Sequence, residues 1–412
     1  MKNILKQTSW LFFSQTITRI IGFFYVIYLA RTLGVFDFGL LTAALAYFSI
    51  ISSVADFGFN RFLIREIARD RLQATQLIWN VAIFRLTLAS VLFAVFSVFL
   101  YALDPDKMRV SLVLLATLAI LPQSIAFTFD AIFVAIQKLQ FSAGALFISG
   151  LTTAIAGLIL IGNGFGVWGA VNALIIGQFI YAATLTYLLY RQQGIFLSAI
   201  KSRVIKEAVL GSLPYGLLGV LGLLYFRIDA VLLSYMKGNF ETGIYGAAYK
   251  FLEAVIFIPS AFSLALFPIL AKLHDGKTDE MKKLYFKSVK LMGAIGIALF
   301  LAYFLILPSL IRFFLPNYLQ SIEAIKILSL SIPFIFMAAP GVQVLFSSEK
   351  YLKTVILLSL FTVAFNVILN LIFIPQFGFR AAAWVTVASD VLSFVIFYLL
   401  IVKKIFKSSL SS

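Results

Sequence analysis

The sequence predicts an all-α integral membrane protein with twelve transmembrane helices in two pseudo-symmetric six-helix bundles. Hydrophobic residues make up 62% of the 412 positions, and only 12% are charged. A water-soluble core cannot bury so much apolar surface, so lipid must be the solvent for most of the chain. The apolar runs are about 20 residues long and do not alternate with period two, which predicts helices and not the strands of a barrel. The second half of the chain also repeats short motifs of the first, which predicts the two bundles.

Twelve apolar runs are long enough to cross a bilayer. They cover residues 10–30, 38–59, 77–103, 110–136, 143–162, 167–190, 209–236, 242–271, 289–314, 322–347, 352–374 and 381–402. No loop between these runs is long enough to form a separate soluble domain. The sequence therefore predicts a chain that consists almost entirely of membrane-spanning helices.

Basic residues concentrate in alternate loops. The second, sixth and eighth loops hold thirteen of the 33 basic residues: Arg61, Arg65, Arg69, Arg71, Arg191, Lys201, Arg203, Lys206, Lys272, Lys277, Lys282, Lys283 and Lys287. Loops rich in Lys and Arg stay in the cytoplasm, so both termini and all even-numbered loops are predicted to be cytoplasmic. This topology signal explains the net charge of +16, and no nucleic-acid partner is expected.

Two motifs recur in the two halves of the chain. Asp37-Phe38-Gly39 is echoed by Glu241-Thr242-Gly243, and Gly164-Phe165-Gly166 by Gln376-Phe377-Gly378. Spans 1–6 therefore match spans 7–12, and both halves begin in the cytoplasm. Parallel repeats of this kind are typical of transporters. They predict an N-terminal bundle over residues 1–205, a C-terminal bundle over residues 206–412, and a central cavity lined by the first, second, seventh and eighth spans.

Four ionisable residues lie inside the seventh and eighth spans: Arg227, Asp229, Lys250 and Glu253. A charge at membrane depth costs about 2.5–3.5 kcal/mol on insertion scales. Lys250 and Glu253 are spaced i, i+3 and share a helix face, so one interpretation is a set of structural ion pairs. The other is a water-filled cavity lined by titratable groups, and the two can coexist.

Three further charged residues fall within predicted spans. Arg19 lies in the middle of the first span, with no acidic residue within several positions, which calls for an aqueous cavity or an anionic ligand. Arg85 lies near the cytoplasmic end of the third span, where it either pairs with Asp56 or snorkels to the interface. Asp390 lies deep in the last span, where it either binds a cation or makes a structural hydrogen bond.

Enzymatic chemistry is not expected. The chain has no cysteine and one histidine, His274, in a polar loop, which excludes disulfides and argues against a Cys- or His-based metal site or catalytic centre. No phosphate-binding Gly-rich loop followed by Lys and Ser or Thr is present, so no ATPase is fused to the chain. The prediction is a secondary transporter without catalytic residues, metal or cofactor.

Three groups of residues follow one another in an order that is typical of one family. They are Asp56-Phe57-Gly58-Phe59-Asn60 leading to Arg65-Glu66, then Arg227-Ile228-Asp229 followed by Gly243-Ile244-Tyr245, and then Asn366, Asn370 and Thr386. In this order on twelve helices they resemble the Wzx-type flippases of lipid-linked oligosaccharides. That family belongs to the MOP exporter superfamily, together with the multidrug and toxin extruders and the lipid II flippases.

The resemblance implies a flippase of the bacterial inner membrane. It would move undecaprenyl-pyrophosphate-linked oligosaccharide repeat units to the outer leaflet by ion-coupled alternating access, for O-antigen or another surface polysaccharide. Its partners would be this substrate, membrane lipids, and the polymerase and chain-length regulator of the same pathway. Arginine offers paired donors to phosphate oxygens, and the expected substrate contacts are Arg19, Arg227, Lys250 and Arg85. The expected ion-coupling residues are Asp229, Glu253 and Asp390.

Other functions remain open. A drug–cation antiporter of the same fold should line its cavity with carboxylates, whereas the first span has Arg19 and no acidic residue. A membrane polysaccharide polymerase usually has a large outer loop, and an O-acyltransferase needs a base such as a membrane-embedded histidine. Neither feature is present in this sequence. The lipid-linked intermediate that accumulates in cells without the protein would separate these functions.

Overall fold

A computed structural model describes residues 2–71, 74–193, 198–273, 278–346 and 349–406. All elements within these ranges are helical, which confirms the predicted all-α fold. In the described ranges, ten helices are long and apolar enough to cross a membrane, or eleven if one bent pair counts as a single span. His274 and Lys277 lie outside the described residues.

The first two predicted spans lie in one long, bent helix. α1 (Lys2–Asp56) bends at Gly34, where φ is 75°, a conformation that glycine adopts without steric cost. α2 (Phe59–Arg69) follows after a break at Phe57 and Gly58, which both have positive φ. The membrane-spanning run Ile17–Arg69 therefore contains two passages. Together with the bent pair, the described helices account for the twelve predicted spans.

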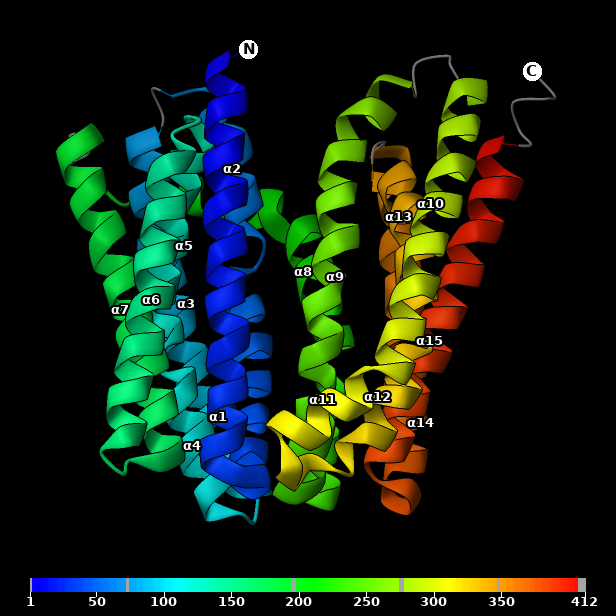
Figure 1. The fold of residues 1–412 in the computed structure, drawn as a ribbon. Coiled ribbons are helices and arrows are strands. Elements are labelled where there is room, and N and C mark those ends of the chain that lie inside the picture. Colours follow the sequence, from blue (N-terminus) through cyan, green and yellow to red (C-terminus); the bar gives the residue numbers. More distant parts are fainter. Residues whose placement is uncertain (1, 72–73, 194–197, 274–277, 347–348, 407–412) are drawn as a thin grey trace. The chain divides into compact units, whose positions relative to one another are not determined.

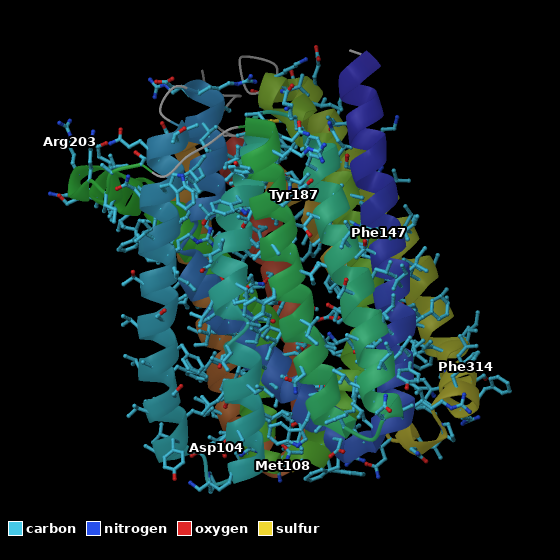
Figure 2. The ribbon with its side chains drawn as sticks, turned by 90° about the vertical axis from the view of Figure 1, so that its left-hand side faces the viewer. Asp104, Met108, Phe147, Tyr187, Arg203 and Phe314 are labelled. Carbon is cyan, nitrogen blue, oxygen red and sulfur yellow. The ribbon has the colours of Figure 1, made fainter. Side chains whose placement is uncertain are left out.

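The chain divides into two compact units, and unit 1 comprises Met1–Leu33 and Leu40–Arg227. Its further helices are α3 (Ala74–Leu103), α4 (Lys107–Thr117), α5 (Ile120–Ala135), α6 (Leu139–Gly162) and α7 (Gly166–Gln193). Of these, α3, α5, α6 and α7 run side by side (Figure 1). Buried apolar side chains of α2, α3, α5 and α7 form its core. Asp104 and Arg203 lie at opposite ends of this unit (Figure 2), as the predicted alternation of loops requires.

Unit 2 comprises Gly34–Gly39 and Ile228–Ser412. Its helices are the second part of α8 (Ser202–Lys237), α9 (Asn239–Leu273), α10 (Thr278–Leu305), α11 (Leu307–Phe314), α12 (Ser321–Ser329), α13 (Ile332–Phe346), α14 (Leu352–Phe377) and α15 (Phe379–Leu400). Short turns are η1 (Pro316–Tyr318), η2 (Glu349–Tyr351) and η3 (Ile401–Phe406). α10 packs along α13, and α14 packs along α15 (Figure 1).

Three of the predicted spans are interrupted or bent within the membrane-spanning run. The span over residues 110–136 is divided into α4 and α5, and the span over 289–314 into α10 and α11. The span over 322–347 bends by 42° between α12 and α13. Pro122, Pro308 and Pro333 lie within the first turn of the second helix of each pair. A proline lacks the backbone N–H that would continue the helix from the preceding turn, which explains the three breaks.

The repeated glycines of the two halves meet in unit 2. A Cβ atom on Gly39 would lie 1.7 Å from the carbonyl oxygen of Asn239, and one on Gly243 would lie 2.0 Å from that of Val35. Because each glycine meets the residue four positions before the other glycine, the two contacts are reciprocal, as a two-fold axis would make them. This geometry supports the internal repeat. The predicted boundary between residues 205 and 206 stays a prediction, while the compact units change over at Arg227.

Candidate functional site

A buried polar centre lies around Asp229 in unit 2. Five neutral polar side chains from α9, α14 and α15 gather near this carboxylate of α8: Tyr245, Asn366, Asn370, Thr386 and Ser389. All five are buried, and Asp229 itself is 2% exposed. Polar groups at membrane depth are costly unless they are bonded to one another, so this grouping marks the centre as a structural or functional site.

Three hydrogen bonds hold the Asp229 carboxylate. The Tyr245 hydroxyl donates to Oδ2 at 2.8 Å, and the Thr386 hydroxyl donates to the same oxygen at 2.7 Å. Asn370 Nδ2 donates to Oδ1 at 2.7 Å. Hydrogen bonds to a carboxylate are short and strong, so α9, α14 and α15 are all tied to one side chain of α8.

A second set of bonds surrounds this centre. Asn370 Nδ2 also donates to Asn366 Oδ1 at 3.0 Å, and Asn366 Nδ2 donates to Ser389 Oγ at 3.2 Å. The Thr386 hydroxyl lies 2.9 Å from the carbonyl oxygen of Ala382 as well. Because a hydroxyl has one proton, Thr386 donates either to Asp229 or to this carbonyl. The centre therefore has a built-in alternative arrangement that leaves Asp229 with one bond fewer.

The centre is short of positive charge. Among the residues that the structure describes, the partners bonded to Asp229 are the neutral side chains of Tyr245, Asn370 and Thr386. Asn370 Oδ1 is buried and accepts no hydrogen bond, and an unsatisfied buried acceptor is costly. Exchange of the amide oxygen and nitrogen of Asn370 would turn this oxygen toward the Asp229 carboxylate. A proton on Asp229 or a bound cation would stabilise the centre in either orientation of the Asn370 amide.

The available ligand atoms are oxygens. They belong to the carboxylate of Asp229, the amide of Asn370, the hydroxyl of Thr386 and the backbone of Ala382. Oxygen ligands suit hard cations, and a single carboxylate balances one positive charge. The described part of the chain has no group of three or more His, Cys, Asp or Glu side chains that would hold a metal ion. The arrangement therefore suits a proton or a monovalent cation.

The three expected ion-coupling residues lie in different surroundings. Asp229 is the middle of the centre, and Asp390 is buried one turn after Thr386 on α15. Glu253 instead accepts from Lys250 Nζ at 2.8 Å, with the two side chains 22% and 26% exposed. The structure thus confirms the predicted i, i+3 ion pair on α9.

Arg85 is the most deeply buried basic residue of unit 1 that the structure describes, at 1% exposure. Its Nη2 donates to Asp56 Oδ1 at 2.8 Å, and its Nη1 donates to Thr128 Oγ1 at 3.1 Å. Of the two predicted alternatives, the structure confirms pairing with Asp56. This ion pair joins the end of α1 to α3, and the bond to Thr128 adds α5.

The remaining expected substrate contacts are not gathered with Asp229. Arg19 is exposed on α1, and Arg227 is partly buried on α8. Arg227 lies two positions before Asp229, and residues two apart on a helix do not face each other. Of the four expected contacts, Arg19, Arg85 and Arg227 belong to unit 1 and Lys250 belongs to unit 2. Their expected common role in a cavity stays a prediction.

The sequence analysis gave no role to the side chains that hold Asp229. Tyr245, Asn366, Asn370 and Thr386 served only as markers of a family. A signal was nevertheless present, because Asn366 and Asn370 lie one turn apart within an otherwise apolar span. Buried amides in a membrane helix need polar partners on neighbouring helices, and Asp229 was a candidate partner.

The chain is similar to known membrane proteins along most of its length. It matches the polysaccharide biosynthesis protein family over residues 4–274 and the MatE family over residues 214–372. It is 24% identical to the uncharacterized membrane protein MJ1068 of Methanocaldococcus jannaschii, over 93% of this chain and 81% of that protein.

Solved structures share its fold at low sequence identity. An inward-facing multidrug resistance MATE family transporter of the MOP superfamily has a TM-score of 0.72 and 17% identity, over 94% of this chain and 96% of that one. The lipid II flippase MurJ, in an inward closed conformation, has a TM-score of 0.73 and 16% identity, over 96% of this chain and 87% of that one. A MOP superfamily transporter from Pyrococcus furiosus has a TM-score of 0.62 and 17% identity, over 100% and 96%.

Proposed function

Because the chain belongs to the polysaccharide biosynthesis protein family, we propose that it flips undecaprenyl-pyrophosphate-linked oligosaccharide repeat units across the cytoplasmic membrane. The family and the similar structures are membrane transporters or flippases, and ten apolar helices in the described ranges make this a multi-pass membrane protein. The product would serve O-antigen or another surface polysaccharide. Its partners would be membrane lipids and the polymerase and chain-length regulator of the same pathway.

The observation that carries the proposal is the state of three acidic groups within the spans. Asp56 is bonded to Arg85, Glu253 is bonded to Lys250, and Asp229 is enclosed by neutral donors. A drug–cation antiporter needs carboxylates that its substrate can reach, whereas Asp56 and Glu253 are each paired with a basic residue and Asp229 is 2% exposed. A lipid-linked pyrophosphate needs basic groups, for which arginine supplies paired donors. This contrast favours an anionic substrate.

Arg19 and Arg227 are the proposed substrate contacts, with Lys250 next. Arg19 is supported by its exposure and by its place in the first span, where no acidic residue occurs. Lys250 keeps about a fifth of its side chain exposed beside Glu253, at 22%. Arg85 is left out of this proposed set, because it is buried against Asp56 and Thr128 and its bonds support a structural role.

We infer that Asp229 is the coupling residue, with Asp390 as a second carboxylate on the same helix as Thr386. Binding of a proton or a monovalent cation at Asp229 would change the charge of a group bonded to α9, α14 and α15. This change of charge would alter the packing of α8, α9, α14 and α15 together. An ion-driven transport cycle requires such a coupled change. Glu253 is a weaker candidate, because Lys250 already neutralises it.

The proposed location is the cytoplasmic membrane, which is the inner membrane in a bacterium, with both termini in the cytoplasm. Reporter fusions at Ser411 and at Lys237 test this topology. They should report opposite sides of the membrane, because the loop charges place Lys237 in an outer loop. Reports from the same side would contradict the topology.

The function itself is tested in cells that lack the protein. The lipid-linked repeat unit should accumulate on the cytoplasmic side and polysaccharide export should stop. Arg19→Lys should restore part of the export, because it keeps the charge but not the paired donors, whereas Arg19→Ala should restore none at normal membrane abundance. Sensitivity to cationic drugs without accumulation of a lipid-linked intermediate would contradict the proposal and favour an antiporter.

A further inference from the structure

The exposed side of α2 has a row of arginines that the proposed substrate contacts do not include. Arg61, Arg65 and Arg69 are spaced four residues apart, so they lie on one side of the helix at steps of about 6 Å along its axis. All three are exposed. We call this row the α2 arginine stripe. The opposite side of α2 is buried through Phe59, Phe62, Leu63 and Ile67.

This helix is not built to lie on a lipid surface. An interfacial helix inserts its apolar side into the boundary between headgroups and acyl chains. The apolar side of α2 is already used, because it packs into the core of unit 1 with side chains of α3, α5 and α7. The side that α2 leaves exposed therefore offers guanidinium groups, and these fit an anionic group that comes to the protein.

The membrane topology requires basic residues in this segment but does not require that they be arginines. Residues 59–71 contain four arginines and no lysine, whereas residues 272–290 contain six lysines and no arginine. The positive-inside rule counts both residue types alike, so lysines would have served in both segments. Only arginine presents a planar fork of donors that matches two phosphate oxygens. The composition of the α2 segment thus points to phosphate chemistry.

Arg65 is held in place but still has donors to offer. Its Nη1 donates to the Tyr215 hydroxyl at 3.1 Å, and its guanidinium carbon lies 5.8 Å from the centre of that ring. Its Nε and Nη2 contact Glu66 Oε1 at 2.9 and 2.8 Å. A guanidinium has five N–H groups, and these contacts use three. Two remain for a ligand, and Tyr215, which accepts from Arg65, keeps its own proton to donate.

Glycines bring Arg65 and Tyr215 together. Gly58, with φ of 77°, begins α2, and a Cβ atom on it would lie 2.3 Å from the backbone nitrogen of Gly216. A Cβ atom on Gly216 would lie 2.6 Å from the carbonyl oxygen of Phe57. The backbone at the break between α1 and α2 therefore packs directly against the backbone of the first part of α8. This contact places Tyr215 beside the stripe. The arginine and its aromatic neighbour are arranged before any ligand binds, which lowers the entropic cost of binding.

We propose that the α2 arginine stripe, together with Tyr215, is an anion site that receives the diphosphate of the lipid-linked substrate on the cytoplasmic side before translocation. Arg61 and Arg65 are one turn apart, so their forks can take the two phosphates of one diphosphate. The Tyr215 ring lies next to them and offers a face to the first sugar. This inference rests on the proposed function, since only a diphosphate-linked substrate has this headgroup.

Binding to the purified full-length protein tests the site. The protein is placed in nanodiscs of neutral phosphatidylcholine and titrated with farnesyl diphosphate at fixed salt. Arg61→Gln with Arg65→Gln should weaken affinity by about tenfold or more, because charge and forks are both lost. Arg61→Lys with Arg65→Lys should weaken it by about threefold, because only the forks are lost.

The matched control is Arg203→Gln with Lys206→Gln. These two exposed residues are on the same side of the membrane, on the first turns of α8 (Figure 2 labels Arg203), and their change removes the same formal charge. Affinity in this variant should stay within about twofold of the wild type. The melting temperature of each variant shows whether the fold is intact, and the Lys variant keeps the test valid if the Gln variant fails to fold.

The possible failures are distinguishable. Wild-type protein that does not bind farnesyl diphosphate would overturn both the site and the proposed function. Wild-type binding with equal affinity in the stripe variants and the control would overturn the site and leave the proposed function standing. Displacement of farnesyl diphosphate by phosphatidylglycerol added to the nanodiscs at a similar concentration would also overturn it, because the stripe would then be a general site for lipid phosphates.

Discussion

Removal of the Asp56 carboxylate tests how unit 1 accommodates Arg85. Arg85 is 1% exposed, and its bonds to Asp56 at 2.8 Å and to Thr128 at 3.1 Å are the ones that balance it. In Asp56→Asn the guanidinium stays buried without a counter-charge, which costs about 3–5 kcal/mol. For a unit of this size each kcal/mol lowers the melting temperature by about 2–4 °C. The expected fall is therefore roughly 6–20 °C.

Removal of the Arg85 charge should cost less stability than removal of the Asp56 charge, because the Asp56 side chain is 25% exposed and its carboxylate can reach water. We expect Arg85→Met to lose about 1–2 kcal/mol. The double variant leaves no buried charge and should recover most of the melting temperature. The assay is differential scanning fluorimetry of the native tryptophans in detergent, with membrane abundance by immunoblot. A melting temperature of Asp56→Asn equal to that of the wild type would refute this account of Arg85.

Three further outcomes are expected. Asp229→Asn keeps the shape of the side chain but removes its charge, so export should stop while immunoblot abundance stays near normal; undiminished export would exclude Asp229 from coupling. Gly243→Leu should strongly reduce membrane abundance, because its Cβ atom would lie 2.0 Å from the Val35 carbonyl oxygen. The control is Gly222→Leu, which should keep normal abundance because no atom lies within 4 Å of the added Cβ atom. Lys250→Gln or Glu253→Gln should each lower stability by about 1–2 kcal/mol, since the pair is partly exposed, and the double change should restore it; additive losses in a double-mutant cycle would show that the pair does not interact.

The passages of the chain through the membrane could be predicted from hydropathy, and the breaks within them could not. Twelve apolar runs and the described helices agree because burial in lipid requires long apolar helices. Breaks occur near Pro122, Pro308 and Pro333, whereas Pro214 and Pro340 lie inside continuous helices, because proline is tolerated in membrane helices when neighbours satisfy the freed carbonyl groups. Whether a given proline breaks a helix therefore depends on tertiary contacts that hydropathy does not report.

Pairs of charges were predictable, whereas the centre around Asp229 was not. Lys250 and Glu253 lie three positions apart on one helix, so their spacing predicts the contact. Asn370 and Thr386 lie 141 and 157 positions from Asp229. No local pattern relates such distant residues, and neutral polar side chains do not stand out in composition as charges do. Their role is visible only when the packing of α8, α14 and α15 is known.

The carboxylates of Asp56 and Asp229 differ in a way that bears on coupling. The Asp56 carboxylate lies 2.8 Å from Arg85 Nη2, so a neighbouring positive charge already balances it. Asp229 is bonded to neutral Tyr245, Asn370 and Thr386 within the described residues. Its net charge changes by one when a proton or a monovalent cation binds or leaves.

A cycle driven by an ion gradient needs a group whose charge state changes and whose partners respond to the change. Asp229 meets both conditions, because the donors from α9, α14 and α15 converge on its carboxylate and the Thr386 hydroxyl has Ala382 as an alternative acceptor. Asp56 meets neither condition while Arg85 is beside it. The proposed coupling step therefore belongs to unit 2, and replacement of Asp56 and Arg85 together by neutral residues should leave the ion dependence of transport unchanged.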